Sequence, residues 1–282
     1  MYRDHFGLTA KPFGLTPDAD FLFDHCGYRE ALNVLLVALD SGEGFIKITG
    51  EVGTGKTLLC RRLLDVLAES HTTAYVPNPL LEPPELYAVV ADEIGAGFNK
   101  ATDSHHALKR IERRLLKLGG SGRSVVLCID EAQAMSDSTL EALRLLSNLE
   151  TEKRKLLHIV LFGQPELDVR LQDYALRQLR QRIVFSYRLP SLGRREVEGY
   201  VNHRLKAAGF QGDGLFAPAA LRKLWFASRG VPRLVNILAN KAMLAAFGQG
   251  DGTVRGCHVR CAVADTADAR RGWLSWLRGV RL

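Results

Sequence analysis

The sequence predicts an α/β protein in which a five-stranded parallel sheet, covered by helices on both faces, is followed by a small all-helical domain. Three observations lead to this prediction. Short apolar runs alternate with helical patterns through the first two thirds of the chain, a glycine-rich loop joins one of these runs to a helix, and strand-like runs stop after Pro190. Alternation of this kind is typical of parallel sheets, because each crossover between parallel strands uses a helix.

The first domain is expected over residues 1–190. Residues 1–23 are rich in Phe, Pro and Gly and are interpreted as an ordered lead-in, and a helix is predicted at 30–40, ended by Ser41-Gly42. The predicted strands are residues 45–49, 73–76, 124–129, 157–162 and 183–187. Their continuous apolar character indicates strands that are buried on both faces.

A helical second domain is expected over residues 191–266. Its predicted helices are 194–208, 218–228, 232–247 and about 256–265. Pro218 and Pro232 each fall in the first turn of a helix, where a missing N–H costs little. The remaining residues, 267–282, form a basic segment with two tryptophans.

A phosphate-binding loop is predicted where the first strand meets the following helix. The stretch Gly50-Glu51-Val52-Gly53-Thr54-Gly55-Lys56-Thr57 fits the pattern G-x-x-x-x-G-K-[ST]. Glycines let backbone N–H groups close around phosphate oxygens, the lysine reaches the outer phosphates, and the threonine hydroxyl can bind Mg²⁺. ATP or GTP with Mg²⁺ is therefore the expected ligand, held by Gly50, Gly53, Thr54, Gly55, Lys56 and Thr57.

An acidic pair follows the buried strand at 124–129. Asp130 is expected to hold the magnesium shell, and Glu131 is expected to act as the general base for a water that attacks the γ-phosphate. An Asp-Glu pair after a strand can also be a charged helix N-terminus. The phosphate-binding loop upstream in the same sheet favours the catalytic interpretation.

Three further polar positions are candidates for the same site. Gln164 follows the strand at 157–162 and could contact the γ-phosphate or the attacking water, or cap its own loop. Arg182 is chosen over Arg177 and Arg180 to neutralise transition-state charge, because it lies nearest the fifth strand. Arg233 begins a helix, where a cation is disfavoured unless an anion such as a nucleotide compensates.

Several stretches of the chain resemble the AAA+ ATPases. They are most similar to the secretion and pilus ATPase family typified by ExeA of type II secretion and MshM of mannose-sensitive haemagglutinin pilus biogenesis, the pilus-type member more closely. The similarity spans about residues 1–265. The stretches that carry it are residues 5–8, 12–13, 15–17, 42–47, 50–60, 74–79, 129–133, 143–152, 162–167, 179–183 and 228–233.

The resemblance implies roles for the candidate residues. Residues 50–57 would be Walker A, Asp130 and Glu131 Walker B, Gln164 sensor 1, Arg182 the arginine finger and Arg233 sensor 2. It also implies ATP as the nucleotide and self-assembly into a ring or filament with ATP at subunit boundaries. Sensor 1 is more often Asn, Ser or Thr in AAA+ proteins, so Gln164 departs from the pattern. The peptidoglycan-binding region of ExeA-type members is not carried over.

The composition says less than the motifs about where the protein acts and what it binds. The 282 residues are 46% hydrophobic with a net charge of +7, which favours polyanionic neighbours such as nucleotides, nucleic acid or anionic lipids. No run of eighteen apolar residues and no signal-peptide layout is present, so a cytoplasmic protein is expected, peripheral on the inner membrane. Trp273 and Trp276, with Arg270, Arg271 and Arg278, are expected to contact anionic lipid or to pack on protein.

Three functions are compatible with these observations. The first is a motor for assembly of a pilus or secretion apparatus, with inner-membrane proteins as partners. The second is a DNA-directed AAA+ regulator of the transposition type, although no dense Lys/Arg stripe supports nucleic acid as a partner. The third is a scaffold that binds ATP and barely hydrolyses it, which the presence of both Lys56 and Glu131 disfavours.

Overall fold

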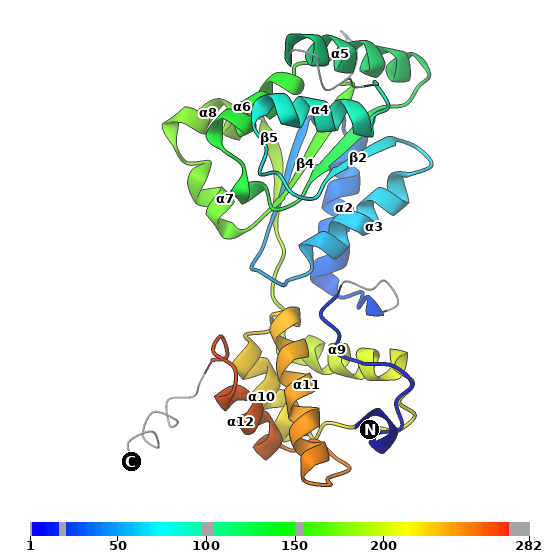
Figure 1. The fold of residues 1–282 in the computed structure, drawn as a ribbon, viewed down its shortest axis with the longest axis vertical. Helices are drawn as coiled ribbons and strands as arrows, with labels where there is room; N and C mark the ends of the chain where they lie inside the picture. The colour runs from blue at the N-terminus through cyan, green and yellow to red at the C-terminus, as the bar shows by residue number, and fades with distance from the viewer. Residues whose placement is uncertain (1, 17–20, 98–103, 151–154, 271–282) are drawn as a thin grey trace. The chain divides into compact units, whose positions relative to one another are not determined.

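The computed structural model describes residues 2–16, 21–97, 104–150 and 155–270 (Figure 1). Their contacts divide into two compact units, which are taken separately below. One contains Cys26–Glu51 and Lys56–Leu189, and the other contains Met1–His25, Val52–Gly55 and Pro190–Leu282. Trp273, Trp276, Arg271 and Arg278 lie outside the described residues.

The first unit is built on a five-stranded, all-parallel sheet, as predicted. Its strands are β1 (Phe45–Thr49), β2 (Thr72–Val76), β3 (Val125–Ile129), β4 (Leu157–Gly163) and β5 (Ile183–Arg188). Their order across the sheet is β2-β3-β4-β1-β5, so β1 lies between β4 and β5, and β3 lies between β2 and β4. Strand positions agree with the sequence prediction to within one residue at each end. The strands β1, β3 and β4 are buried apolar runs, as expected. The edge strands differ: β2 is partly buried, and β5 alternates between half-buried and exposed positions.

Helices cover both faces of this sheet. One face is covered by α2 (Cys26–Asp40) and α3 (Lys56–Leu67), which contact each other and the strands β1, β2, β4 and β5. The other elements of the unit are α4 (Pro83–Glu93), α5 (Ser104–Gly120), η2 (Ala132–Ala134), α6 (Asp137–Leu146), α7 (Pro165–Arg170), η3 (Tyr174–Leu176) and α8 (Arg177–Arg182). Alternate side chains of β3 serve the two faces: Val125, Leu127 and Ile129 belong to the core under α4 and α6.

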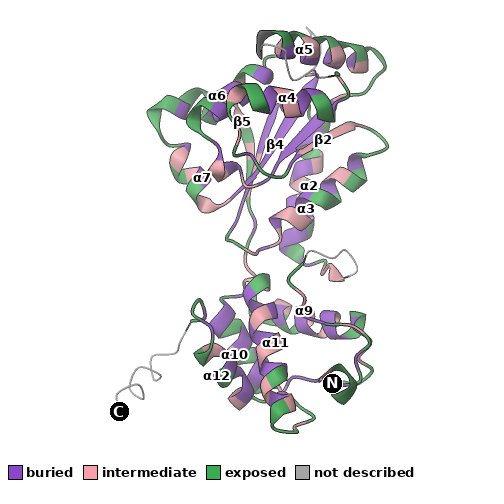
Figure 2. Cartoon of the chain, viewed as in Figure 1, coloured by how far each residue is buried: buried purple, intermediate pink, exposed green. Residues whose placement is uncertain are grey.

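The second unit has its own core, formed by the helices α9 (Arg194–Ala207), α10 (Pro218–Ser228), α11 (Pro232–Gly248) and α12 (Gly256–Ala264) (Figure 2). These bounds match the predicted helices to within one residue. Pro218 and Pro232 stand in the first turns of α10 and α11, as expected.

The N-terminal segment, with the short helix α1 (Tyr2–His5), packs in the helical unit rather than on the sheet to which the sequence analysis assigned it. Phe6, Leu8 and Phe13 are buried among its helices. The buried Arg204 fixes the segment by donating from Nε to the carbonyl oxygen of Pro12 at 2.5 Å. A buried guanidinium needs several acceptors, and backbone carbonyls supply them here.

The interior strand β3 is a site where shortening a side chain should destabilise the sheet unit, because all five of its residues are buried. Leu127 is 0% exposed, so Leu127→Ala should cost about 2–5 kcal/mol of unfolding free energy through lost burial and a cavity. The control Leu80→Ala, at a side chain 70% exposed, should stay within about 0.5 kcal/mol of the parent. Urea unfolding followed by circular dichroism measures both, and equal costs for the two variants would contradict the assignment of the core.

Candidate nucleotide site

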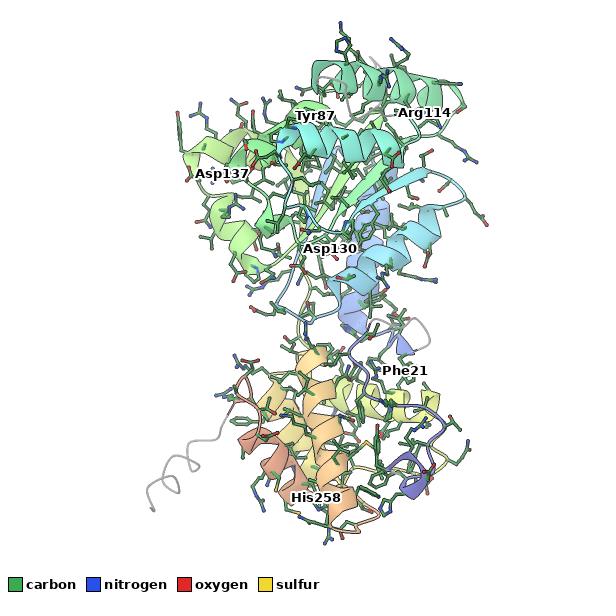
Figure 3. The ribbon with its side chains drawn as sticks, in the orientation of Figure 1. Phe21, Tyr87, Arg114, Asp130, Asp137 and His258 are labelled. Atoms are coloured by element: carbon green, nitrogen blue, oxygen red, sulfur yellow. The ribbon has the colours of Figure 1, made fainter. Side chains whose placement is uncertain are left out.

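The sheet order brings three strand ends together at one edge. Parallel strands all end at the same edge, and β3, β4 and β1 are direct neighbours. The loop after β1, the acidic pair after β3 and Gln164 after β4 therefore meet there, and Figure 3 shows Asp130 at this end of the sheet. The N–H of Gly50 donates to the carbonyl oxygen of Gly163 at 3.2 Å, which ties the first of these loops to the last.

Two glycines shape the loop between β1 and α3. Gly53 has φ 82° and Gly55 has φ 101°, a left-handed region in which a Cβ is strained. Turns of this kind expose successive N–H groups on one concave side, which suits them to anionic oxygens. Thr54 between them is buried, and Lys56 begins α3.

The Lys56 side chain is buried, and no carboxylate of the residues that the structure describes is in contact with it. It is 5% exposed, and its ammonium donates to the carbonyl oxygens of Gly50 and Glu51 at 2.8 and 3.0 Å. Burial lowers the pKa of Lys56, and the negative charges of Glu131 and Asp130 offset part of that effect. A phosphate group would place negative charge in direct contact with the ammonium, where the fold supplies only carbonyl oxygens.

Thr57 and Asp130 form the second part of the site. The Thr57 hydroxyl donates to Asp130 Oδ2 at 2.6 Å, and the N–H of Glu131 donates to Oδ1 at 3.0 Å. Asp130 faces α3 because it continues the alternate positions Val126 and Cys128 of β3. A hydroxyl next to a buried carboxylate is a hard oxygen pair that fits Mg²⁺.

Glu131 stands in a strained backbone conformation and is held by two amides. Its φ is 52° and ψ 37°, a left-handed geometry that is uncommon outside glycine. Its Oε2 accepts from Gln133 Nε2 at 2.6 Å and from Gln164 Nε2 at 3.0 Å. Burial acts to raise the pKa of Glu131, but the hydrogen bonds from Gln164 and Gln133 and the charge of Lys56 outweigh it, so the pKa is lowered.

Gln133 is the site residue that the sequence analysis missed as a candidate. Its Oε1 accepts the N–H of Gln164 at 2.9 Å, and its own carbonyl oxygen accepts from Arg170 Nη1 at 2.8 Å. It therefore joins the end of β3 to the end of β4. Its position two residues after Glu131 was visible, but the left-handed turn that folds it back toward the carboxylate was not.

The candidate arginines have distinct surroundings. Arg182 donates to Ser147 Oγ at 2.6 Å, and Arg177 lies over the Tyr174 ring at 3.9 Å. Arg180 is exposed on α8. In the helical unit, which includes Val52–Gly55, the main-chain N–H of Arg233 donates to the carbonyl oxygen of Gly53 at 3.2 Å.

This strand order, with its loop and acidic pair, is the P-loop AAA+ fold. Residues 39–171 match the family model described as "AAA domain". The chain is also 41% identical over 250 residues to "General secretion pathway protein A" of Aeromonas hydrophila, which covers 89% of this chain and 46% of the relative. The chain thus spans about half the length of the curated relative that it matches.

Solved structures support the same fold. The ORC2 protein of Aeropyrum pernix matches with a TM-score of 0.66 at 19% identity, over 90% of this chain and 71% of that one. The Cdc6p protein of Pyrobaculum aerophilum matches with a TM-score of 0.67 at 16% identity, over 89% and 71%. At such identities these likenesses establish the fold alone.

The burial of Lys56 predicts a conflict between stability and ligand binding. Because its pKa in the fold is lowered, the charged form costs stability at every pH below that pKa, and the cost is relieved as pH rises through it. Lys56→Met should therefore leave the melting temperature of the nucleotide-free protein unchanged or raised by about a few degrees. Its stabilisation by Mg-ATP should disappear.

Differential scanning fluorimetry with and without Mg-ATP measures both effects of Lys56→Met. Lys206→Met, at an exposed lysine of α9, is the control and should keep the response to nucleotide. A nucleotide-free Lys56→Met protein that melts well below the parent would contradict the argument.

The hydrogen bond from the Gln164 side chain to Glu131 predicts how a substitution should change the pH dependence of ATP hydrolysis. Because the pKa of Glu131 is lowered in the fold, its carboxylate adds stability that is lost only as pH falls through that lowered pKa. Gln164→Leu removes one donor and should raise this pKa, moving the acid limb of kcat/KM for ATP hydrolysis to higher pH. The control Gln172→Leu, at an exposed glutamine, should not move it; coincident limbs in parent and Gln164→Leu would refute the role.

Proposed function

We propose that this protein is an ATPase that binds ATP with Mg²⁺ at the loop after β1 and hydrolyses it with Glu131 as general base. One observation carries the proposal. The buried Lys56 ammonium, the Thr57–Asp130 pair and the amide-held Glu131 carboxylate stand at the same edge of one sheet. Phosphate charge, metal and water activation thus each have a chemically suitable group.

The side chains support a division of roles in this reaction. Lys56 would exchange its two carbonyl acceptors for phosphate oxygens, and Thr57 and Asp130 would hold Mg²⁺, which neutralises negative charge on the phosphates when bound. Glu131 is kept as a carboxylate near neutral pH by its lowered pKa, so it can accept a proton from water. Gln164 and Gln133 orient that carboxylate from two sides.

Two arginines and self-assembly belong to the same proposal. Arg233 serves as the cation from the helical unit, and Arg182 serves as the finger offered to ATP of a neighbouring copy in a ring or filament. The hydrogen bond from Arg182 to Ser147 would position the guanidinium on the side of the sheet unit that carries α6. Charge on the transferred phosphoryl group is what these cations would stabilise.

The biological setting is proposed from the relative in Aeromonas hydrophila, which is named for the general secretion pathway. On this basis the ATPase cycle would drive assembly or remodelling of a secretion apparatus at the inner membrane, with proteins of that apparatus as partners. The narrower form of the proposal is a pilus apparatus of the MshM type. The alternative of a DNA-directed regulator gains no support, because the similar solved structures share only the fold with this chain.

A cytoplasmic site, peripheral on the inner membrane, is the proposed location. Among the described residues, no helix is long and apolar enough to cross a bilayer. At the start of the basic C-terminal segment, the described Arg270 lies over the Phe226 ring at 4.6 Å.

The decisive test is Glu131→Gln, which keeps the shape of the side chain and removes the base. Phosphate release should fall by about 10²–10⁴-fold, as expected for loss of a general base, while ATP affinity measured by calorimetry stays within a few fold of the parent. Glu69→Gln at an exposed glutamate of the same unit is the matched control. Undiminished turnover in Glu131→Gln, or no Mg²⁺-dependent ATP binding by the parent, would overturn the proposal.

A further inference from the structure

Helix α5 carries a concentration of positive charge that the nucleotide site does not use. Its seventeen residues contain five Lys or Arg and a single acidic residue, Glu112. The loop that follows adds Arg123. Helix α5 therefore has a large excess of basic over acidic side chains, and the surroundings of each cation show which of them are available to a ligand.

The inner face of α5 is already occupied. Ala107, Ile111 and Leu115 are buried in the core that α5 shares with α4. Two of the five cations also serve this packing, because Arg110 donates to the carbonyl oxygen of Gly97 at 2.7 Å and Arg114 donates to that of Ile94 at 2.8 Å. Arg114 thus binds the carbonyl of the residue that caps α4, and Arg110 binds a carbonyl of the segment that follows α4.

The outer face of α5 carries three exposed cations and one exposed carboxylate, that of Glu112. Lys109, Arg113 and Lys117 recur at intervals of four residues, so their side chains lie along one side of the helix, and all three are exposed. Among the described residues, no carboxylate forms an ion pair with any of them. Leu116, 48% exposed, projects from the same side. We call Lys109, Arg113, Leu116 and Lys117 the α5 face.

The α5 face is remote from the nucleotide site. Helix α5 leads into the start of β3, and its Gly119 lies against Leu156 just before β4, so it borders the edge of the sheet where strands begin. Figure 3 shows Arg114 on α5 and Asp130 at opposite ends of the sheet unit. Changes on this face can therefore be tested without altering the catalytic groups.

We propose that the α5 face is a docking surface for the headgroups of an anionic lipid bilayer. A row of cations on one side of an amphipathic helix attracts anionic lipids, each Lys or Arg adding a similar increment of affinity. Leu116 favours a lipid bilayer over other polyanions as the ligand, because an exposed leucine among cations gains binding free energy when it enters the acyl boundary of a bilayer. Contacts with nucleic-acid phosphates would use the cations and leave this leucine without a role. The inference stands apart from ATP hydrolysis.

Vesicle flotation of the full chain tests this inference. The parent should float with phosphatidylcholine vesicles that contain about 30 mol% phosphatidylglycerol, and not with phosphatidylcholine alone. Lys109→Gln/Arg113→Gln/Lys117→Gln should lower the partition coefficient about 10²-fold, since about fivefold is expected for each of the three cations. Leu116→Asn, with charge unchanged, should lower it by a smaller factor of about threefold or more.

A matched control separates local from overall charge. Lys206→Gln/Arg222→Gln/Arg260→Gln removes three exposed cations of the helical unit and should float like the parent. Circular dichroism and ATP turnover without vesicles should be unchanged in every variant, which excludes misfolding and keeps this test distinct from that of the ATPase proposal.

Several outcomes would overturn the α5 inference. If the parent does not float with anionic vesicles, the α5 face does not bind lipid. If the two triple variants float equally, the cations of the α5 face have no special role in binding. Equal binding by the α5 triple variant and loss of binding in a chain ending at Asp268 would assign membrane contact to the C-terminal segment instead. Binding of duplex DNA that needs the three cations, without vesicle binding, would assign the face to nucleic acid.

Discussion

The chemistry of this protein depends on a buried ammonium that no carboxylate of the described residues contacts directly. Lys56 begins α3 directly after the loop, so its position is fixed by the backbone, and burial lowers its pKa. Two carbonyl oxygens accept hydrogen bonds from its ammonium, but they carry no net charge to balance it. An anionic ligand is therefore the natural completion of the site, which explains why carboxylates stand near Lys56 but not in contact with it.

Asp130 and Glu131 differ in role because their carboxylates have different hydrogen-bond partners. Asp130 is occupied by Thr57 and by the N–H of Glu131, which suits it to a structural place beside a metal. Glu131 is turned away from that pair by its left-handed backbone and is held by side-chain amides of Gln133 and Gln164. Adjacent residues of one sequence motif thus differ in role because the chain reverses between them.

Local sequence predicted most of the fold because strand and helix signals were strong. The five strands and the proline-initiated helices were found to within about a residue, since a short apolar run and a first-turn proline are local properties. Residues 1–23 were assigned to the sheet unit because they precede it. Contacts of Phe6 and Phe13 with the helical core are long-range, and no pattern in the segment specifies them.

The sequence by itself determined the phosphate loop, the acidic pair and the parallel sheet, because each rests on residue types at fixed short spacing. Only the tertiary structure decided which strand ends are neighbours, and so that Gln133 and Gln164 share Glu131. It likewise separated the cations of α5 into two that bind carbonyls at or just after the end of α4 and three that are exposed. Such pairings depend on contacts between distant segments, which spacing along a chain does not encode.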